Sequence, residues 1–494
     1  MSKKTSGNKH TDSSNMKQKK EPVITENQSN RNFTMLSQLI KSLKPVNFRE
    51  LAKLSAGENL TQRHLVVYTV KELLRFAKEN SWNMCQHNGF VYIYNGEYWN
   101  KIDDKHFVKF LGSAAKRMGW EESYSDYYKN KKELFQQFMS EANLPSPNAN
   151  TKKVLINLEN GTYEVSDNGG KLRAFDPNDF LTYQLPFDYD PKAKAPLFQK
   201  YLNRILPDKE LQNVLAEFAG YVFIPTESLK LEKVLLLYGT GANGKSVFFD
   251  ILRALVGESN FSAFSLQSLT NENGYFRHQL ADKLLNYATE ISGRIETSYF
   301  KTLASGEPIE ARLPYRKPVM IYNYARLIFN VNELPADVEH TEGYFRRFII
   351  IPFDQKIPEE EQDKQLASKI IQNELPGVFN WVLAGLQRLQ AQGTFSASDV
   401  IASEIESYRT ESDSVALFLN DFYYKTSTTE YVLQKDMYDE YKNYVRENGY
   451  RALSNIKFGK RLEILGYVRD DKSAGKIVFA QKTNKATLNF QYKM

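Results

Sequence analysis

Cysteine is almost absent from the sequence, and long apolar runs are missing altogether. Cys85 is the only cysteine among 494 residues, which excludes an internal disulfide and a cysteine-rich zinc site and favours a reducing cytoplasm. No apolar run approaches the roughly 20 residues that a membrane-spanning helix needs. The opening residues, MSKKTSGNKH, lack the apolar segment of a signal peptide. We therefore expect a cytoplasmic protein without membrane contact.

Apolar side chains are also nearly missing from residues 1–32, which are rich in Lys, Ser and Asn. Such a segment cannot bury enough surface to become ordered, so we predict a disordered basic tail. The chain as a whole contains 41% hydrophobic and 13% aromatic residues, which is typical of globular proteins. Its length predicts about two to four domains.

An aromatic alternation, FVYIYNGEYWNKI, occupies residues 90–102 and predicts a β-hairpin with its turn at Asn95-Gly96. The aromatic side chains either form one face of a small core, which we favour, or stack on nucleic-acid bases. They are Tyr92, Tyr94, Tyr98 and Trp99. Helical spacing of apolar residues predicts helices over residues 64–80, 105–119 and 131–142.

The clearest motif follows the apolar run VLLLY at residues 234–238, which predicts a buried strand of a parallel sheet. The next eight residues fit G-x-x-x-x-G-K-[ST]. They are Gly239, Thr240, Gly241, Ala242, Asn243, Gly244, Lys245 and Ser246. Glycines let backbone N–H groups surround phosphate oxygens, Lys245 reaches the β- and γ-phosphates, and Ser246 ligates Mg²⁺. A helix with Gly257 as its C-cap is predicted next, so we expect a site for ATP and Mg²⁺.

Two further buried-strand candidates, residues 283–288 and 327–331, precede Glu290 and Asn332. Ligands and catalytic groups of open α/β sheets collect at the carboxyl ends of the strands. Glu290 is therefore predicted to orient the attacking water or to hold the water shell of the metal. Asn332 is placed to touch the γ-phosphate or that water. Thr289 occupies the place of a second carboxylate, so direct metal ligation is left to Ser246.

Two adjacent arginines, Arg346 and Arg347, stand before the apolar run IIIPF. One interpretation is a structural salt-bridge pair. The other is an arginine finger that acts on the nucleotide of a neighbouring subunit.

Together these residues resemble the superfamily 3 helicases, specifically the helicase part of the phage and plasmid primase–helicase family, which includes the poxvirus primase–helicase. The resemblance covers about residues 152–389 and rests on motifs in family order. They read GTGANGKS, NYATEI, FKTLASGEPIEARLPYRKP, LIFNVNELP and YFRRFIIIPF. It implies an AAA+-type α/β ATPase that works as a hexameric ring.

The resemblance also implies a hairpin over residues 310–318 that projects into the ring channel. Arg312, Arg316 and Lys317 would contact phosphates of single-stranded DNA, and Tyr315 would stack on a base. A solvated basic turn is the alternative interpretation.

Strand-like runs are predicted over residues 153–161 and 181–191. The second run contains Asp188 and Asp190, which resemble the paired metal-binding aspartates of a primase. No recognisable third carboxylate or histidine supports them, so a catalytic role is disfavoured. We expect a helicase without a primase domain.

Positive charge gathers at the C-terminus. From residue 451 to 494, ten Lys and Arg stand against three Asp and Glu, a net charge of +7 compared with +6 for the whole chain. Helices over residues 431–449 and 454–467 and a hairpin over 468–480 predict a winged helix-turn-helix. Lys457, Lys460 and Arg461 are expected to contact duplex phosphates. A protein-interaction module is the alternative.

The expected organisation is a tail (1–32), an N-terminal α+β domain of unknown role (33–145), a lead-in and helical collar (146–228), an AAA+-type ATPase domain (229–395) and a winged-helix domain (410–494). The expected function is an ATP-dependent replicative DNA helicase of a phage, plasmid or mobile element, in the cytoplasm of a bacterial host. Expected partners are single-stranded DNA, duplex origin DNA, further copies of the chain in a homo-hexamer, and a separate primase or other replication proteins. The alternatives are a DNA-binding ATPase switch or helicase loader and, less favoured, a small-molecule kinase.

Overall fold

The computed structural model describes residues 35–483 except 81, 88, 143–152, 167–168, 227, 290, 292–294, 313–317, 336–337 and 474. The predicted tail, Glu290 and the tip of the predicted DNA hairpin thus lie outside the described residues. The chain forms two compact units. The first consists of Met1–Ala77 and Ile102–Glu141, and the second of Lys78–Lys101 and Ala142–Met494. Each is described by itself.

The first unit is helical where apolar periodicity predicts it. Asp103 starts one helix by accepting hydrogen bonds from the backbone N–H groups of Lys105 and His106, as an N-cap does. Trp120 Nε1 donates to Thr69 Oγ1 at 2.9 Å inside the unit. The helices are α2 (Phe48–Leu51), α3 (Gln62–Glu79), α4 (Asp104–Arg117), α5 (Glu122–Asp126) and α6 (Tyr128–Glu141). The three predicted helices are confirmed.

The aromatic hairpin is also confirmed, as part of a three-stranded antiparallel sheet of β1 (Met84–His87), β2 (Phe90–Tyr94) and β3 (Trp99–Ile102). Asn95 Oδ1 closes the turn by accepting from the backbone N–H groups of Glu97 and Tyr98. All four aromatic side chains of the hairpin are buried, so the core interpretation is the right one.

A second antiparallel sheet contains β4 (Leu155–Leu158), β5 (Gly161–Ser166) and β6 (Gly169–Arg173). The strand predicted over residues 181–191 is wrong, because this segment is irregular. Its apolar residues Leu185 and Phe187 are buried. Leu185 N donates to Asn157 O of β4, and Phe187 O accepts from Glu159 N, directly after that strand. Prolines at 186 and 191 cannot donate to a strand ladder, which explains why the run stays irregular.

A five-stranded parallel sheet forms the centre of the second unit and confirms the predicted α/β class. Its order is β13-β7-β12-β9-β8, which places the strand before the glycine-rich motif between two neighbours. The strands are β7 (Val234–Tyr238), β8 (Phe261–Ser262), β9 (Leu285–Ala288), β12 (Arg326–Val331) and β13 (Phe348–Pro352).

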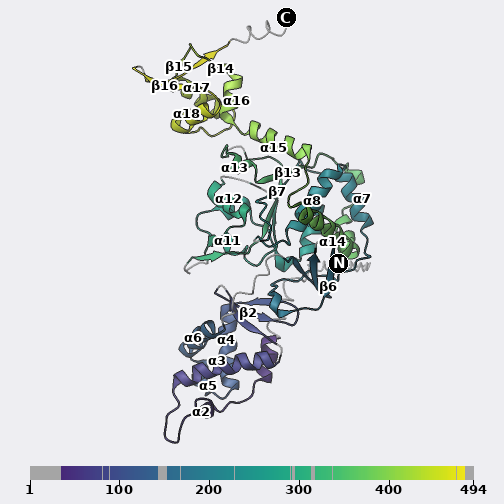
Figure 1. Ribbon diagram of the computed structural model, residues 1–494, viewed down its shortest axis with the longest axis vertical. Helices are drawn as coiled ribbons and strands as arrows, with labels where there is room; N and C mark the ends of the chain where they lie inside the picture. Colours follow the sequence, from purple (N-terminus) through teal and green to yellow (C-terminus); the bar gives the residue numbers. More distant parts are fainter. Residues whose placement is uncertain are drawn as a thin grey trace, which may run out of the picture. The chain divides into compact units, whose positions relative to one another are not determined.

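Alternate residues of β7 enter two different cores. Leu235 and Leu237 pack with α7 (Pro196–Ile205), α8 (Lys209–Tyr221), α9 (Lys245–Val256) and α14 (Leu366–Gln392). Val234 and Leu236 pack instead with α12 (Thr297–Ser305) and its neighbours. Figure 1 shows α8 and α14 on one side of the sheet and α12 on the other. Burial on both faces explains why these strands are apolar throughout.

A short antiparallel hairpin joins β10 (Ile309–Ala311) to β11 (Val319–Ile321). Its two strands flank the hairpin that the sequence predicts over 310–318 and extend beyond it, to Ile309 and Ile321. Short elements elsewhere are η1 (Pro177–Asp179), η2 (Glu258–Asn260), α10 (Leu266–Thr270), α11 (Tyr275–His278), α13 (Glu342–Phe345) and η3 (Glu359–Glu361).

The C-terminal segment contains the two predicted helices and the predicted hairpin. The elements are α15 (Asp399–Glu411), α16 (Ser414–Asp421), β14 (Tyr424–Thr426), β15 (Val432–Leu433), α17 (Gln434–Glu447), α18 (Asn455–Ile464), β16 (Arg469–Lys472), β17 (Gly475–Val478) and β18 (Ala480–Lys482). β15 adds a third strand beside β17. Among the helices that the structure describes, none has the length and apolar character needed to cross a membrane.

Candidate active site

The loop between β7 and α9 has the backbone of a phosphate cradle. β7 ends at Tyr238 and α9 begins at Lys245, as the motif predicts. Gly244 has φ +87°, and a Cβ there would lie 2.7 Å from Ile205 Cγ2. At Gly239 a Cβ would lie 2.6 Å from the carbonyl oxygen of Phe353. Only glycine fits both positions, so the loop wraps tightly in front of the helix N-terminus, where anions bind.

Lys245 is buried inside this loop. Its Nζ donates to Gly239 O at 2.5 Å and to Asn243 Oδ1 at 3.2 Å. Burial lowers the pKa of Lys245. The phosphates of a nucleotide would offer this ammonium stronger acceptors than a carbonyl and an amide oxygen. Ser246 is exposed at the start of α9, where a metal ion can reach its hydroxyl.

Two contacts that sequence reasoning missed fix the loop from outside. Tyr201 of α7 donates its hydroxyl to Gly244 O at 2.8 Å, and burial raises its pKa. Asn243 Nδ2 donates to the carbonyl oxygen of Phe353, directly after β13, at 2.8 Å. Asn243 belongs to the predicted motif, but neither contact carries a signal in the local pattern, because the two partners lie far apart in sequence.

The other predicted groups at this edge follow the neighbouring strands. Gly239 N donates to Val331 O at 3.0 Å, which places Asn332 beside the loop with an exposed side chain. β9 pairs with β12 in parallel and ends at Ala288. Glu290 itself lies outside the described residues. The carboxyl end of the sheet thus brings the loop, Ser246 and Asn332 together.

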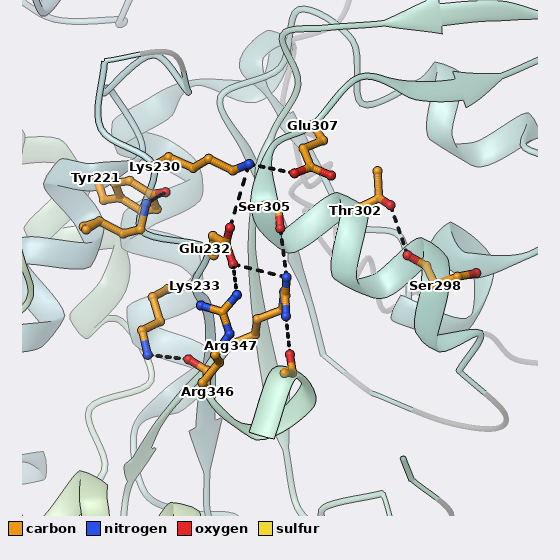
Figure 2. Close-up of polar contacts among 12 residues, drawn as sticks. Tyr221, Lys230, Glu232, Lys233, Ser298, Thr302, Ser305, Glu307, Arg346 and Arg347 are labelled. Atoms are coloured by element: carbon orange, nitrogen blue, oxygen red, sulfur yellow. Dashed lines mark hydrogen bonds and ion pairs between the residues drawn. The ribbon is translucent and has the colours of Figure 1, made fainter. Parts of the chain in front are cut away.

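Arg346 and Arg347 lie at the opposite, amino end of the sheet. Figure 2 shows both guanidinium groups directed at Glu232, two residues before β7. Arg346 Nη2 is 2.6 Å and Arg347 Nη2 is 3.1 Å from the same oxygen, Oε2. Burial lowers the pKa of Arg347, and the Glu232 carboxylate acts in the opposite direction. The salt-bridge interpretation thus has its contacts within one chain, and the finger role stays a prediction.

The hairpin β10–β11 rests on α11. Arg277 Nε donates to Glu310 O at 2.8 Å, and Arg312 N donates to Gly274 O at 3.2 Å. Two neighbouring aromatic side chains of α11, Tyr275 and Phe276, are 39% and 37% exposed. Sequence reasoning missed this pair. The predicted DNA contacts Tyr315, Arg316 and Lys317 lie in the part of the chain that the structure does not describe.

The C-terminal cations differ in their surroundings. Lys457 and Lys460 are exposed on α18. Arg461, by contrast, binds Asp413 Oδ2 through Nε at 3.0 Å and Nη2 at 2.5 Å. Asp413 is buried and caps α16. This ion pair stabilises the C-terminal fold, so the geometry favours Lys457 and Lys460 over Arg461 as phosphate contacts.

Comparison with protein families follows the same segments. A family described as "D5 N terminal like" matches residues 71–207, a family of unknown function (DUF5906) matches 237–347, and a "Poxvirus D5 protein-like" family matches 410–492. The second match spans the glycine-rich loop, Asn332 and both arginines. The glycine-rich loop of residues 239–246, called the P loop from here on, follows an inner strand of a parallel sheet. This arrangement is typical of α/β proteins with a phosphate-binding loop. The two D5-type matches and the helicase name of a relative described below fit a D5-like superfamily 3 helicase, as the motifs predict.

Individual relatives are distant. "Putative helicase L207/L206" of Acanthamoeba polyphaga mimivirus is 23% identical over 339 residues, covering 63% of this chain and 35% of that protein. The chain thus spans about a third of the length of this curated relative. Two apo structures of the NrS-1 C-terminal region are 13% and 14% identical, cover 85% of this chain and 100% and 99% of theirs, and have TM-scores of 0.46. The likeness to the two NrS-1 structures carries no conclusion about activity.

Proposed function

We propose that the protein is an ATP-dependent replicative DNA helicase of a phage, plasmid or other mobile element. It moves along single-stranded DNA as a ring of identical subunits, and a hexamer is the form that the family resemblance implies. The D5-like matches and the helicase name of the mimivirus relative support this function. The α/β sheet with the P loop on an inner strand supports an AAA+-type ATPase.

The observation that carries the proposal is the separation of the P loop from the arginine pair. β7 and β13 are parallel neighbours, with Val234 opposite Phe348 and Tyr238 opposite Pro352. The P loop follows β7, whereas Arg346 and Arg347 precede β13. Each strand has five residues, which corresponds to about 16 Å. An arginine side chain held at the amino end by Glu232 cannot contact a nucleotide at the carboxyl end of its own sheet.

A second subunit would complete such a site, as a ring requires. In this arrangement Lys245 and the backbone N–H groups of the loop bind the phosphates, and Glu290 and Asn332 orient the attacking water. The hydroxyl of Ser246 suits Mg²⁺, which would neutralise phosphate charge when bound. A neighbouring subunit adds an arginine to the γ-phosphate.

DNA contacts are proposed at two places. The hairpin, with Arg312, Tyr315, Arg316 and Lys317, binds the single strand, and the exposed rings of Tyr275 and Phe276 add stacking surfaces beside it. The C-terminal residues 410–494 form a winged-helix domain that binds duplex origin DNA through Lys457 and Lys460. The expected domain boundaries remain part of this proposal.

The test is strand displacement from a forked DNA duplex. Wild-type protein with ATP and Mg²⁺ is expected to release the strand, and Lys245→Ala is not. ATP hydrolysis stimulated by single-stranded DNA without any displacement would favour the alternative of an ATPase switch or helicase loader. Hydrolysis that does not respond to DNA would contradict both.

A further inference from the structure

Five charged side chains meet at the amino ends of β7 and β13. Glu232 lies at their centre, and its Oε2 contacts both arginines (Figure 2). Its other oxygen, Oε1, is 3.8 Å from Lys230 Nζ, and that ammonium lies 2.6 Å from Glu307 Oε1. A single carboxylate thus links the two arginines to the rest of the network.

The two arginines are held very differently. Arg347 has a side chain only 10% exposed, and it also donates to Gly343 O and, at 3.2 Å, to Ser305 Oγ. Arg346 has a side chain 50% exposed, and among the described residues its guanidinium donates to Glu232 alone. A guanidinium has five N–H donors. Arg346 therefore keeps exposed donors for a further anion, whereas Arg347 is buried and held by partners inside the subunit.

The backbone holds Glu232 in a fixed and uncommon conformation. Its φ is +57°, in the left-handed region that a glutamate rarely adopts without constraint from its surroundings. That constraint comes from both sides. Leu231 N donates to Tyr221 Oη at 3.3 Å, Lys233 Nζ donates to Arg346 O at 2.5 Å, and Val234 N donates to Arg347 O at 2.8 Å. The carboxylate is thereby directed at the arginines.

We propose that Glu232 is a positioning residue for a trans-acting arginine, that this arginine is Arg346, and that Arg347 is its anchor. The ligand of Arg346 is the γ-phosphate of a nucleoside triphosphate bound to a second copy of the chain. Glu232 holds one nitrogen of the guanidinium and leaves the others open to phosphate oxygens. This inference rests on the proposed ATPase and adds to it a carboxylate in the segment that leads into β7.

Glu232→Gln tests the role, because it removes the charge and keeps the shape. The kcat for ATP hydrolysis is expected to fall about tenfold, a part of the larger effect that a finger exerts. The KM for ATP should stay unchanged, because ATP binds at the other end of the sheet. Glu307→Gln is the matched control: it alters the same ion network through Lys230 without touching an arginine, and should keep the wild-type kcat.

Mixing two inactive or weakened variants shows whether Glu232 supports the ATPase site of a neighbouring subunit or that of its own subunit. Glu232→Gln mixed with an equal amount of Lys245→Ala should regain about a quarter of the wild-type rate, because random assembly pairs a good P loop with a good Glu232 at that frequency. Mixing it with a Glu232→Gln/Lys245→Ala double variant should restore nothing. Should Glu232→Gln fail a thermal-melt check, Arg346→Lys replaces it in the same mixtures, since lysine keeps the charge but loses the fork.

A wild-type kcat for Glu232→Gln would overturn the inference, as would a wild-type kcat for Arg346→Lys where that variant takes its place. A loss of ATP hydrolysis that mixing with Lys245→Ala does not restore would also overturn it. The wild-type chain in the same assay reports on the proposed function separately. An inactive wild type contradicts the ATPase itself. An active wild type with an unaffected Glu232→Gln contradicts only the role of Glu232.

Discussion

Cationic side chains lie at both ends of β7 and β13, Lys245 at the carboxyl end and Arg346 at the amino end, but the two are positioned by different means. At the carboxyl end, the glycines and Lys245 are consecutive in sequence, and their spacing alone specifies the loop. At the amino end, Glu232 meets Arg346 from 114 residues away, and only the parallel pairing of the strands brings them together. A site whose residues follow one another in the chain can be predicted from the sequence, whereas a site assembled by strand pairing is found only once the fold is known.

The largest effect is expected at the carboxyl end. Lys245→Ala should lower ATP hydrolysis by about a thousandfold, because the charge that stabilises the β- and γ-phosphates is lost. Steady-state phosphate release measures it. Lys425→Ala, an exposed lysine in β14, is the control and should keep full activity. Substantial hydrolysis by Lys245→Ala would mean that this loop is not the nucleotide site.

At the amino end, substitution of the two arginines should lower the free energy of unfolding by different amounts. Arg347→Ala is expected to lower the free energy of unfolding by about 2 kcal/mol, because it removes a buried guanidinium that donates two hydrogen bonds and forms an ion pair with Glu232. Arg346→Ala should lower it by less than about 1 kcal/mol, since its ion pair is half exposed and screened by solvent. Urea denaturation of both variants measures the difference. Equal losses would remove the distinction between anchor and finger.

The hydroxyl of Tyr201 tests whether contacts from outside the P loop affect ATP binding at the carboxyl end. Tyr201→Phe removes the hydrogen bond to Gly244 O and should raise the KM for ATP about threefold, at a loss of about 1 kcal/mol of stability. Tyr183→Phe is the matched control, because its hydroxyl donates to Leu155 O, away from the loop. It should lose similar stability and keep its KM. A KM increase in both variants would point to a general loosening.

The smallest effect concerns α18, which lies outside both ends. Replacing Lys457 and Lys460 by alanine should flatten the log–log salt dependence of duplex binding by about 1.8, or 0.9 for each lost phosphate contact. Arg461 is left intact, because its loss would break the ion pair with Asp413. ATP hydrolysis stimulated by single-stranded DNA should be unaffected. An unchanged salt slope would remove α18 from the proposed duplex contacts.

Sequence reasoning predicted β7 to the residue and α9 with its Gly257 C-cap, because glycine, lysine and apolar spacing act locally. It failed for residues 181–191, where the apolar pattern resembles a strand but two prolines cannot donate the hydrogen bonds of a strand ladder. It did not find Tyr201 or Glu232, whose partners are set by helix packing and strand pairing. It also counted Arg461 as a surface cation, although a buried aspartate from a different helix engages it.

The central claim is that the ATPase site is split between two copies of the chain. The direct measurement is ATP hydrolysis by Arg346→Ala and Lys245→Ala, each alone and then mixed in equal amounts. Each variant alone should be nearly inactive, and the mixture should reach about a quarter of the wild-type rate, because a mixed interface joins one intact P loop to one intact Arg346. A mixture no more active than the mean of its components, at every ratio tested and with subunit exchange verified, would contradict the claim.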